Sequence, residues 1–195
     1  MYDFICPMKK SNHMLSVIAP MYNEESVITS FIEKTVAVLA AHFNHYELLL
    51  IDDGSIDNTV ANCLPFIKAN PHIRILTLSR NYGHEIASTA GLENACGDYV
   101  ILMDSDLQHP PEIIPEMVKM ADEGYDVVCG ARLNRPSESW LKKLAAKFFY
   151  KAAKRMTGLD LNSETGNFRL LKRPVVNSLK RMKENNRHLI MMFAY

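Results

Sequence analysis

The chain has 195 residues, in which 22 Lys and Arg balance 22 Asp and Glu, so its formal net charge at pH 7 is zero. This balance creates no overall field that would attract nucleic acid, and we expect no nucleic-acid partner. The length and the 48% hydrophobic content suit a single globular domain over residues 1–195. No stretch approaches the roughly 20 apolar residues of a membrane-spanning helix.

Short apolar runs alternate with segments of helical periodicity, which predicts strands alternating with helices. The predicted strands are residues 15–19, 47–51, 73–78, 99–103 and 126–131. The predicted helices are residues 25–42, 59–69, 85–95 and 111–123. Because the strands are continuous apolar runs, we expect them to be buried on both faces. The sequence therefore predicts an α/β fold with a doubly wound, mostly parallel sheet and helices on both faces.

The pattern changes after residue 132. Residues 140–156 are predicted to form a basic amphipathic helix, typical of a helix that lies on an anionic bilayer. The alternative is a helix that packs on the core. A short strand over 168–171 and a helix over 174–183 are also predicted.

Acidic side chains follow the fourth predicted strand. Asp104 and Asp106 flank Ser105 directly after the apolar run 99–103. Two carboxylates at the end of a buried strand are costly unless a cation neutralises them. A divalent ion that also bridges to substrate phosphates does so. We therefore expect Mg²⁺ or Mn²⁺ and a phosphorylated substrate, and the alternative is a polar turn.

Three segments that follow predicted strands carry a family resemblance: Pro20–Glu25, Asp52–Asp57 and Asp104–Asp106. In this order they resemble the inverting glycosyltransferases of family 2, which have the GT-A fold, a Rossmann-like nucleotide-sugar-binding fold. The resemblance implies that residues 14–132 form the nucleotide-sugar-binding half of one catalytic domain. Residues 133–195 would form its acceptor-side, membrane-proximal segment.

The segments Ser79–Glu85, Asp106–Glu112 and Thr165–Leu171 are similar to the branch that uses polyprenyl phosphates. This branch includes bactoprenol (undecaprenyl-phosphate) glucosyltransferases and dolichol-phosphate mannosyltransferases. It implies transfer of a hexose to a polyprenyl phosphate, with glucose from UDP-glucose preferred and mannose from GDP-mannose as the alternative. Bactoprenol members continue into two membrane-spanning helices, and the chain ends at Tyr195, about where they would begin. We expect a shortened or naturally short form, cytoplasmic and at the inner face of the cell membrane, with a homo-oligomer left open.

The resemblance also implies roles for single residues. Tyr22 would stack on the base, Glu24 would accept hydrogen bonds from the ribose, and Asp53, rather than Asp52, would accept from a base N–H. The expected donor-binding residues are Pro20, Tyr22, Glu24, Asp52, Asp53, Asp104 and Arg132. The expected metal ligands are Asp104, Asp106 and Gln108, and the expected catalytic residues are Asp104, Asp106, Asn167 and Arg169.

Arg132 and Arg169 would bind phosphates, because a guanidinium matches a phosphate through two parallel hydrogen bonds. For Arg169 the alternative is a surface ion pair. A lipid phosphate is ionised at neutral pH, so it can attack the sugar without a carboxylate base, and direct attack inverts the anomeric centre. The bactoprenol group usually carries Asp where this chain has Asn167. This departure leaves open a non-catalytic protein that holds nucleotide-sugar.

Two other enzyme classes share parts of the pattern. A phosphatase of the haloacid-dehalogenase type also places Asp-x-Asp after a strand, but after its first strand, and with Thr or Val where this chain has Gln108. A dinucleotide-binding oxidoreductase would carry Gly-x-Gly-x-x-Gly after the first strand, where this chain has Pro20–Glu24. Both classes therefore fit the chain less well.

Overall fold

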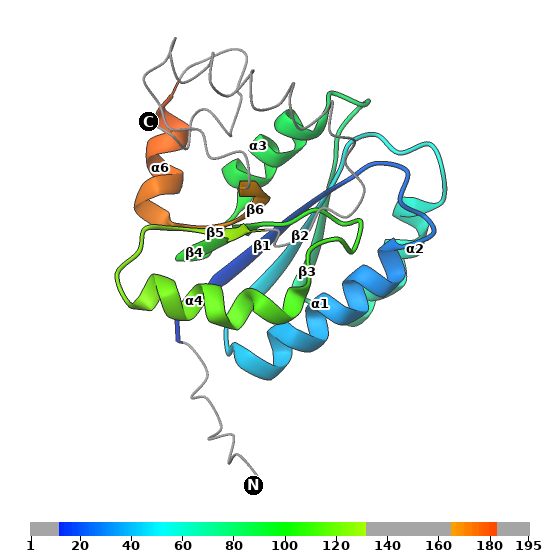
Figure 1. Cartoon of the computed structure of the whole chain (residues 1–195). Coiled ribbons are helices and arrows are strands. Elements are labelled where there is room, and N and C mark those ends of the chain that lie inside the picture. Colours follow the sequence, from blue (N-terminus) through cyan, green and yellow to red (C-terminus); the bar gives the residue numbers. More distant parts are fainter. Residues whose placement is uncertain (1–11, 132–164, 183–195) are drawn as a thin grey trace, which may run out of the picture.

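The computed structural model describes residues 12–131 and 165–182, which form one six-stranded sheet with helices on both faces (Figure 1). The strands are β1 (Leu15–Met21), β2 (Tyr46–Asp52), β3 (Ile73–Thr77), β4 (Tyr99–Leu102), β5 (Val127–Ala131) and β6 (Thr165–Lys172). The helices are α1 (Ile28–His42), α2 (Thr59–Ala69), α3 (His84–Asn94), α4 (Ile114–Asp122) and α6 (Arg173–Arg181), with a 3₁₀ turn at Pro111–Ile113.

Every element predicted within these residues is present, with small shifts at the ends. The helix predicted from residue 25 begins at Ile28, because the carbonyl of Glu24 first accepts from the N–H groups of Val27 and Ile28 in a turn. The helix predicted over 111–123 opens with a 3₁₀ turn before α4. The predicted helix 140–156 lies outside the described residues. None of the described helices is long and apolar enough to cross a bilayer.

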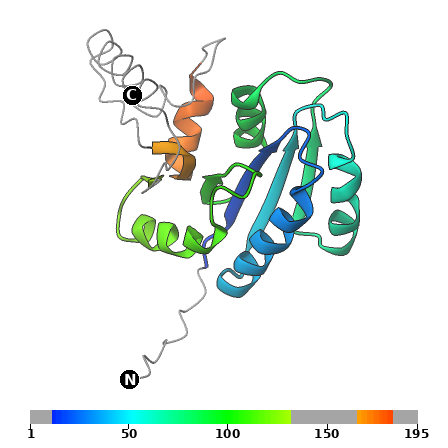
Figure 2. The ribbon, with the colours of Figure 1, turned by 45° about the vertical axis from the view of Figure 1, so that its right-hand side comes forward.

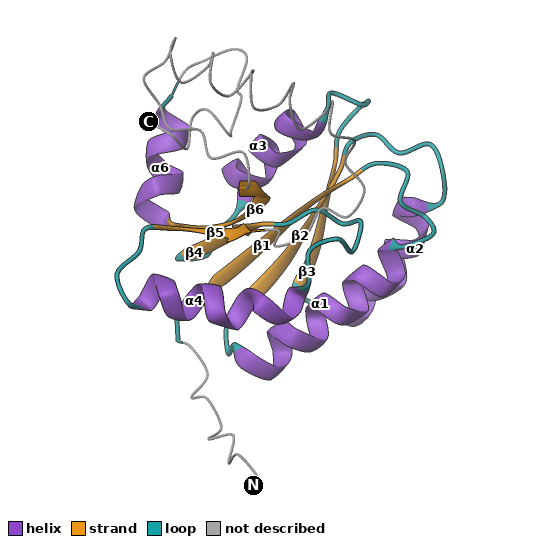
Figure 3. Cartoon of the chain, in the orientation of Figure 1, coloured by secondary structure: helices purple, strands orange, loops and turns teal. Residues whose placement is uncertain are grey.

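The strand order is β3-β2-β1-β4-β6-β5, and the sheet is mostly parallel, as predicted (Figure 3). β1 pairs in parallel with β2 and β4, and β2 pairs in parallel with β3. β6 runs antiparallel to both of its neighbours, β4 and β5. The short strand predicted over 168–171 therefore belongs to a longer strand that separates β4 from β5.

Two apolar layers hold the helices against the sheet. Figure 2 shows helices on either side of the sheet in a second view. Val17 points to the layer shared with α1, α2 and α4, and its neighbour Ile18 points to the layer shared with α3 and α6. This alternation explains why β1 reads as a continuous apolar run. Helix α3 lies so close to the sheet that a Cβ on Gly91 would come within 2.2 Å of Ile18 Cγ2.

A buried carboxylate joins the strands near their amino ends. Glu47 Oε1 accepts from Ser16 Oγ at 2.6 Å and from the Cys96 N–H at 2.8 Å, and Oε2 accepts from Arg74 at 2.8 Å. Burial alone would raise the pKa of Glu47, but these hydrogen bonds outweigh it and hold the pKa below its ordinary value of 4.5. A group with a lowered folded-state pKa stabilises the fold above the unfolded pKa, and this stability is lost as the pH falls through the folded value.

We expect Glu47→Gln to reduce the free energy of unfolding at pH 7 by about 1–3 kcal/mol, because one oxygen becomes an amide that cannot accept from Arg74. The deficit should shrink as the pH falls below 4.5, where the wild-type carboxylate becomes protonated. Urea unfolding between pH 3 and 7 measures both effects. The control is Glu33→Gln on the exposed face of α1. A deficit that stays constant with pH would contradict this account of Glu47.

Candidate functional site

The carboxyl ends of β1, β2 and β4 lie at one edge of the sheet, where Met21 is the register partner of Asp52 and Ile18 is that of Leu102. A pocket of about 390 Å³ opens at this edge. It is lined by Pro20, Met21, Tyr22, Glu24, Asp53, Asn81, Gly83, His84, Ala87, Asp104, Ser105 and Asp106. The segments that follow four different elements thus meet in one cavity.

Hydrogen bonds tie the loop after β1 to the loop after β2. Asn23 adopts a left-handed backbone with φ 54°, its N–H donates to Ser55 Oγ at 3.0 Å, and its Oδ1 accepts from the Ile56 N–H at 3.0 Å. Asn tolerates this conformation better than most side chains. The fixed turn leaves the ring of Tyr22 40% exposed at the pocket and Pro20 buried beside it.

The two aspartates after β2 have different surroundings. Asp53 is only 3% exposed, yet it lines the pocket, and its two oxygens accept from the N–H groups of Tyr82 and Gly83, each at 2.8 Å. Asp52 is buried away from the pocket lining, and its Oδ1 accepts from the Ser55 N–H. Its Oδ2 has no hydrogen-bond partner within the described residues. Asp53 is therefore the one that faces the site, and it also anchors the loop after β3.

The turn after β4 presents two carboxylates to the pocket. Ser105 Oγ donates to the carbonyl of Pro20 at 3.0 Å, which joins this turn to the end of β1. Asp106 Oδ1 accepts from the Gln108 N–H at 2.9 Å, while the Gln108 side chain is exposed and is not part of the lining. Leu107 has φ 62°, a strained backbone for a bulky residue. Asp104 and Asp106 thus share one cavity, and a metal-binding role for Gln108 stays a prediction.

Asp104 lies between two histidines, His84 and His109, for which the sequence predicted no catalytic or ligand-binding role. His84 is the first residue of α3, and its Nε2 lies 2.8 Å from Asp104 Oδ1. His109 is buried, accepts from the Asp104 N–H at 3.2 Å and stacks on Phe168. The available signal for His84 was its position, a polar side chain directly after Gly83 at the start of a helix that follows a strand. Its bond to Asp104 raises the pKa of His84, with burial acting in the opposite direction.

The described lining of the pocket is acidic: it holds Glu24, Asp53, Asp104 and Asp106 and no Lys or Arg. Burial raises the pKa of Glu24, and the charges of Asp106 and Asp57 raise it further. Within residues 12–131 and 165–182, no group of three or more His, Cys, Asp or Glu side chains is arranged so that it could hold a metal ion. The two carboxylates of Asp104 and Asp106 fit Mg²⁺ or Mn²⁺. Mg²⁺ typically takes one or two protein carboxylates and completes its coordination shell with phosphates and water.

β6 brings the later predicted residues toward this edge. Asn167 lines a small recess that adjoins the pocket and shares Pro20, His84 and Asp104 with it. Arg169 is only 4% exposed and pairs in register with Leu102, so the alternative of a surface ion pair is wrong. Burial lowers the pKa of Arg169, and the charges of Cys129 and Glu85 oppose this shift.

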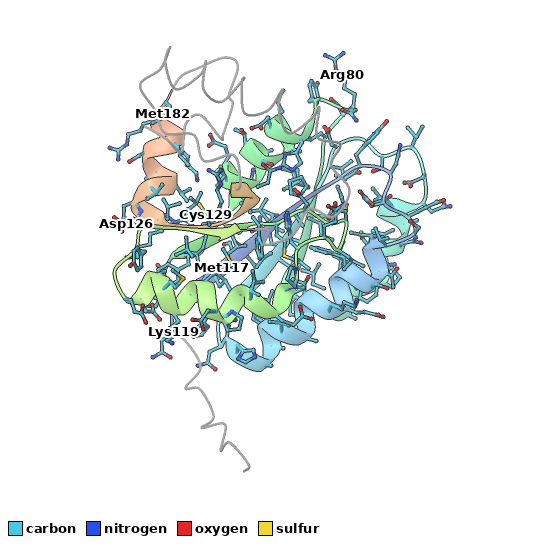
Figure 4. The ribbon with its side chains drawn as sticks, viewed as in Figure 1. Arg80, Met117, Lys119, Asp126, Cys129 and Met182 are labelled. Carbon is cyan, nitrogen blue, oxygen red and sulfur yellow. The ribbon has the colours of Figure 1, made fainter. Side chains whose placement is uncertain are left out.

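Arg132, which was expected to bind the donor phosphates, lies outside the described residues. Arg80, which follows β3, is exposed at the outer edge of the molecule and points away from it (Figure 4). Its guanidinium lies 4.8 Å from the centre of the Tyr82 ring. Of the predicted site residues, the pocket lining brings together six: Pro20, Tyr22, Glu24, Asp53, Asp104 and Asp106.

A family model, "Glycosyl transferase family 2", matches residues 16–180. The chain belongs to this family. An uncharacterized glycosyltransferase of Synechocystis, sll0501, is 42% identical over 181 residues, which are 93% of this chain and 57% of that protein. YkcC of Bacillus subtilis, also named an uncharacterized glycosyltransferase, is 40% identical over 88% of this chain and 53% of its own length. The chain thus spans little more than half of these family 2 relatives.

Two solved structures show the same fold. A mannosyltransferase from Pyrobaculum calidifontis, in complex with GDP-Man and Mn²⁺, has a TM-score of 0.63 at 19% identity and covers 89% of this chain and 48% of its own. Glucosyl-3-phosphoglycerate synthase from Mycobacterium tuberculosis, with Mn²⁺, UDP-Glc and glycerol 3-phosphate, has a TM-score of 0.63 at 21% identity, over 84% of this chain and 58% of its own. The family 2 chain therefore shares the GT-A fold of these enzymes, while its transferase activity and the polyprenyl-phosphate branch stay predictions.

We expect Asp53→Asn to lower the free energy of unfolding by about 1–3 kcal/mol and to speed amide hydrogen exchange at Tyr82 and Gly83. An Asn side chain has one acceptor oxygen for these two donors, and its NH₂ group would face an N–H. Asp52→Asn is the matched control and should change stability by less than about 1 kcal/mol, because its oxygen can still accept from Ser55. Equal effects of the two substitutions would contradict the conclusion that Asp53, and not Asp52, anchors the loop after β3.

Proposed function

We propose that the chain is the catalytic part of an inverting, metal-dependent hexosyltransferase that uses a nucleotide-sugar donor and a polyprenyl phosphate acceptor. The observation that carries the donor side is the pocket itself, in which Asp104, Asp106 and Glu24 meet beside the exposed ring of Tyr22. A nucleoside diphosphate is complementary to such a pocket. Its flat base can stack on the Tyr22 ring, and its phosphates can share a cation with the carboxylates.

In this proposal each donor-side residue has a binding task. Tyr22 stacks on the base, Glu24 accepts from the ribose hydroxyls, and Pro20 shapes the pocket beside them. Asp53 holds the loop at Tyr82 and Gly83 through its two hydrogen bonds. Each of its oxygens keeps a lone pair, so it can also accept from a base N–H.

Asp104 and Asp106 would hold the Mg²⁺ or Mn²⁺ ion, with Gln108 as a predicted further ligand. When bound, the ion neutralises the charge that develops on the leaving nucleoside diphosphate. The carboxylates bind and orient this cation, and no protein base is required, because the attacking lipid phosphate is already ionised. Attack from the face opposite the leaving group inverts the anomeric centre.

The acceptor side rests on the sequence resemblance and on the placement of β6. Asn167 lies in the recess beside Asp104, close to where an acceptor would approach. Arg169, two residues further along β6, is buried and interacts with the charge of Glu85, which lines the same recess as Asn167. Arg132 is proposed to bind the donor phosphates. A lipid acceptor would bring the protein to a membrane surface, at the cytoplasmic face.

Glucose from UDP-glucose is the proposed donor sugar, and mannose from GDP-mannose is the alternative within the same class. A second candidate function is a protein that binds nucleotide-sugar without transferring it. The observation that favours this candidate is Asn167, which stands beside Asp104 where the bactoprenol group usually carries Asp. Binding without transfer would identify it.

The test has two stages on the 195-residue chain. A thermal-shift panel of UDP- and GDP-sugars with Mn²⁺ should identify one donor by a rise in melting temperature. That donor, labelled in the sugar, is then incubated with a short polyprenyl phosphate. We expect Asp104→Asn and Asp106→Asn each to reduce transfer by about a hundredfold or more, since each removes part of the cation's binding site.

Asp126→Asn is the control, because this exposed aspartate lies before β5, away from the pocket (Figure 4). It should leave transfer unchanged. Donor binding with no transfer to any polyprenyl phosphate would overturn the enzyme proposal in favour of the binding protein. No Mn²⁺-dependent donor binding at all would overturn both.

A further inference from the structure

His84 occupies a special position at the mouth of the pocket. It is the first residue of α3 and follows Gly83, whose φ of 95° is a conformation that favours glycine. The chain therefore turns sharply at Gly83, and the imidazole of His84 lies against Asp104 with a distance of 2.8 Å from Nε2 to Oδ1. Both side chains line the pocket, and they are 42% and 24% exposed, respectively.

The backbone that carries His84 is held firmly by the end of β2. Asp53 accepts from the N–H groups of Tyr82 and Gly83, the two residues directly before His84. Gly54 packs against the backbone of Arg80 so closely that a Cβ would come within 2.5 Å of its carbonyl carbon. The contacts of Asp53 and Gly54 thus fix the loop after β3 against the loop after β2. The backbone from which the His84 imidazole extends is therefore held in place.

The other side of Asp104 is fixed by the turn that follows it. His109 accepts from the Asp104 N–H through Nδ1, and the same nitrogen lies 3.7 Å from Asp104 Oδ2. Because this nitrogen accepts, it has no hydrogen to donate to the carboxylate. An ionised carboxylate only accepts, so the short contact with His84 requires that His84 Nε2 carries the hydrogen.

We propose that His84 is a positioning residue: its Nε2–H donates to Asp104 Oδ1 and holds this carboxylate in the orientation that receives a divalent cation. The inference rests on the proposed function, since it needs the cation site at Asp104 and Asp106. It adds a connection from β2 to β4 across the pocket, which runs from Asp53 through the backbone at Gly83 to His84 and Asp104. Hydrogen bonds that orient metal-binding side chains commonly change metal affinity 10–100-fold when they are removed.

The experiment measures Mn²⁺ binding to the 195-residue chain by calorimetry in the presence of saturating UDP or GDP, whichever the wild type binds. We expect His84→Ala to weaken Mn²⁺ binding about tenfold or more. His84→Gln should restore most of the affinity, because its side-chain amide can donate from the place of Nε2. His84→Asn, which is polar but shorter, should behave like the alanine variant.

His45→Ala is the matched control, since this histidine is exposed in the bend before β2. It should leave Mn²⁺ binding unchanged. Crystal structures of the metal-free wild type and His84→Asn give a second readout, in which the Asp104 carboxylate should keep its orientation in the first and turn in the second.

Three results would overturn the inference. Wild-type Mn²⁺ affinity in both His84→Ala and His84→Asn would show that Asp104 needs no support from His84, while the proposed function stands. Equal losses in the Gln and Asn variants would show that the donor at Nε2 is not what matters. Absence of any Mn²⁺-dependent binding of UDP or GDP by the wild type would remove the proposed function together with the inference.

Discussion

The parallel pairing of β1 with both β2 and β4 is the constraint on which the site depends. Parallel strands end at the same edge, so residues that follow β1, β2, β3 and β4 arrive in one cavity although they are far apart in the chain. The same geometry concentrates Glu24, Asp53, Asp104 and Asp106 in one cavity, where burial and the charge of Asp106 raise the pKa of Glu24. The fold tolerates this concentration because main-chain N–H groups bind Asp53 and an imidazole binds Asp104.

The loops at the pocket are stabilised by hydrogen bonds from one loop to another. Asn23 binds the loop after β2, Asp53 binds the loop after β3, and Ser105 binds the end of β1. Each loop is thus held by a neighbour from another strand. The edge of the sheet can therefore present polar groups in fixed positions, although loops at strand ends are usually the most variable parts of a domain.

Much of the fold was predictable because its signals are local. Apolar runs with acids directly after them indicated β1, β2 and β4 and their shared edge. The place of β6 was not predictable from its short apolar run, because strand order depends on pairing between distant segments. Sequence periodicity also gave no sign that Asp53 binds the backbone at Gly83, that His84 contacts Asp104, or that Arg169 is buried. The first two depend on how closely the loops approach, which is set by backbone conformations at Gly54 and Gly83. The burial of Arg169 depends on the pairing of β6 with β4 and β5.

The antiparallel return of β6 has a consequence for how the protein is made. The first four strands pair with partners that are already present once residue 102 has been synthesised, whereas Arg169 must find Leu102 across a long stretch of chain that includes α4 and β5. Closing such a loop costs entropy before any contact repays it. As the chain leaves the ribosome amino end first, the acidic edge can assemble while Asn167 is still untranslated. Asn167, which lines the recess beside the pocket, is therefore added to the site after the acidic residues.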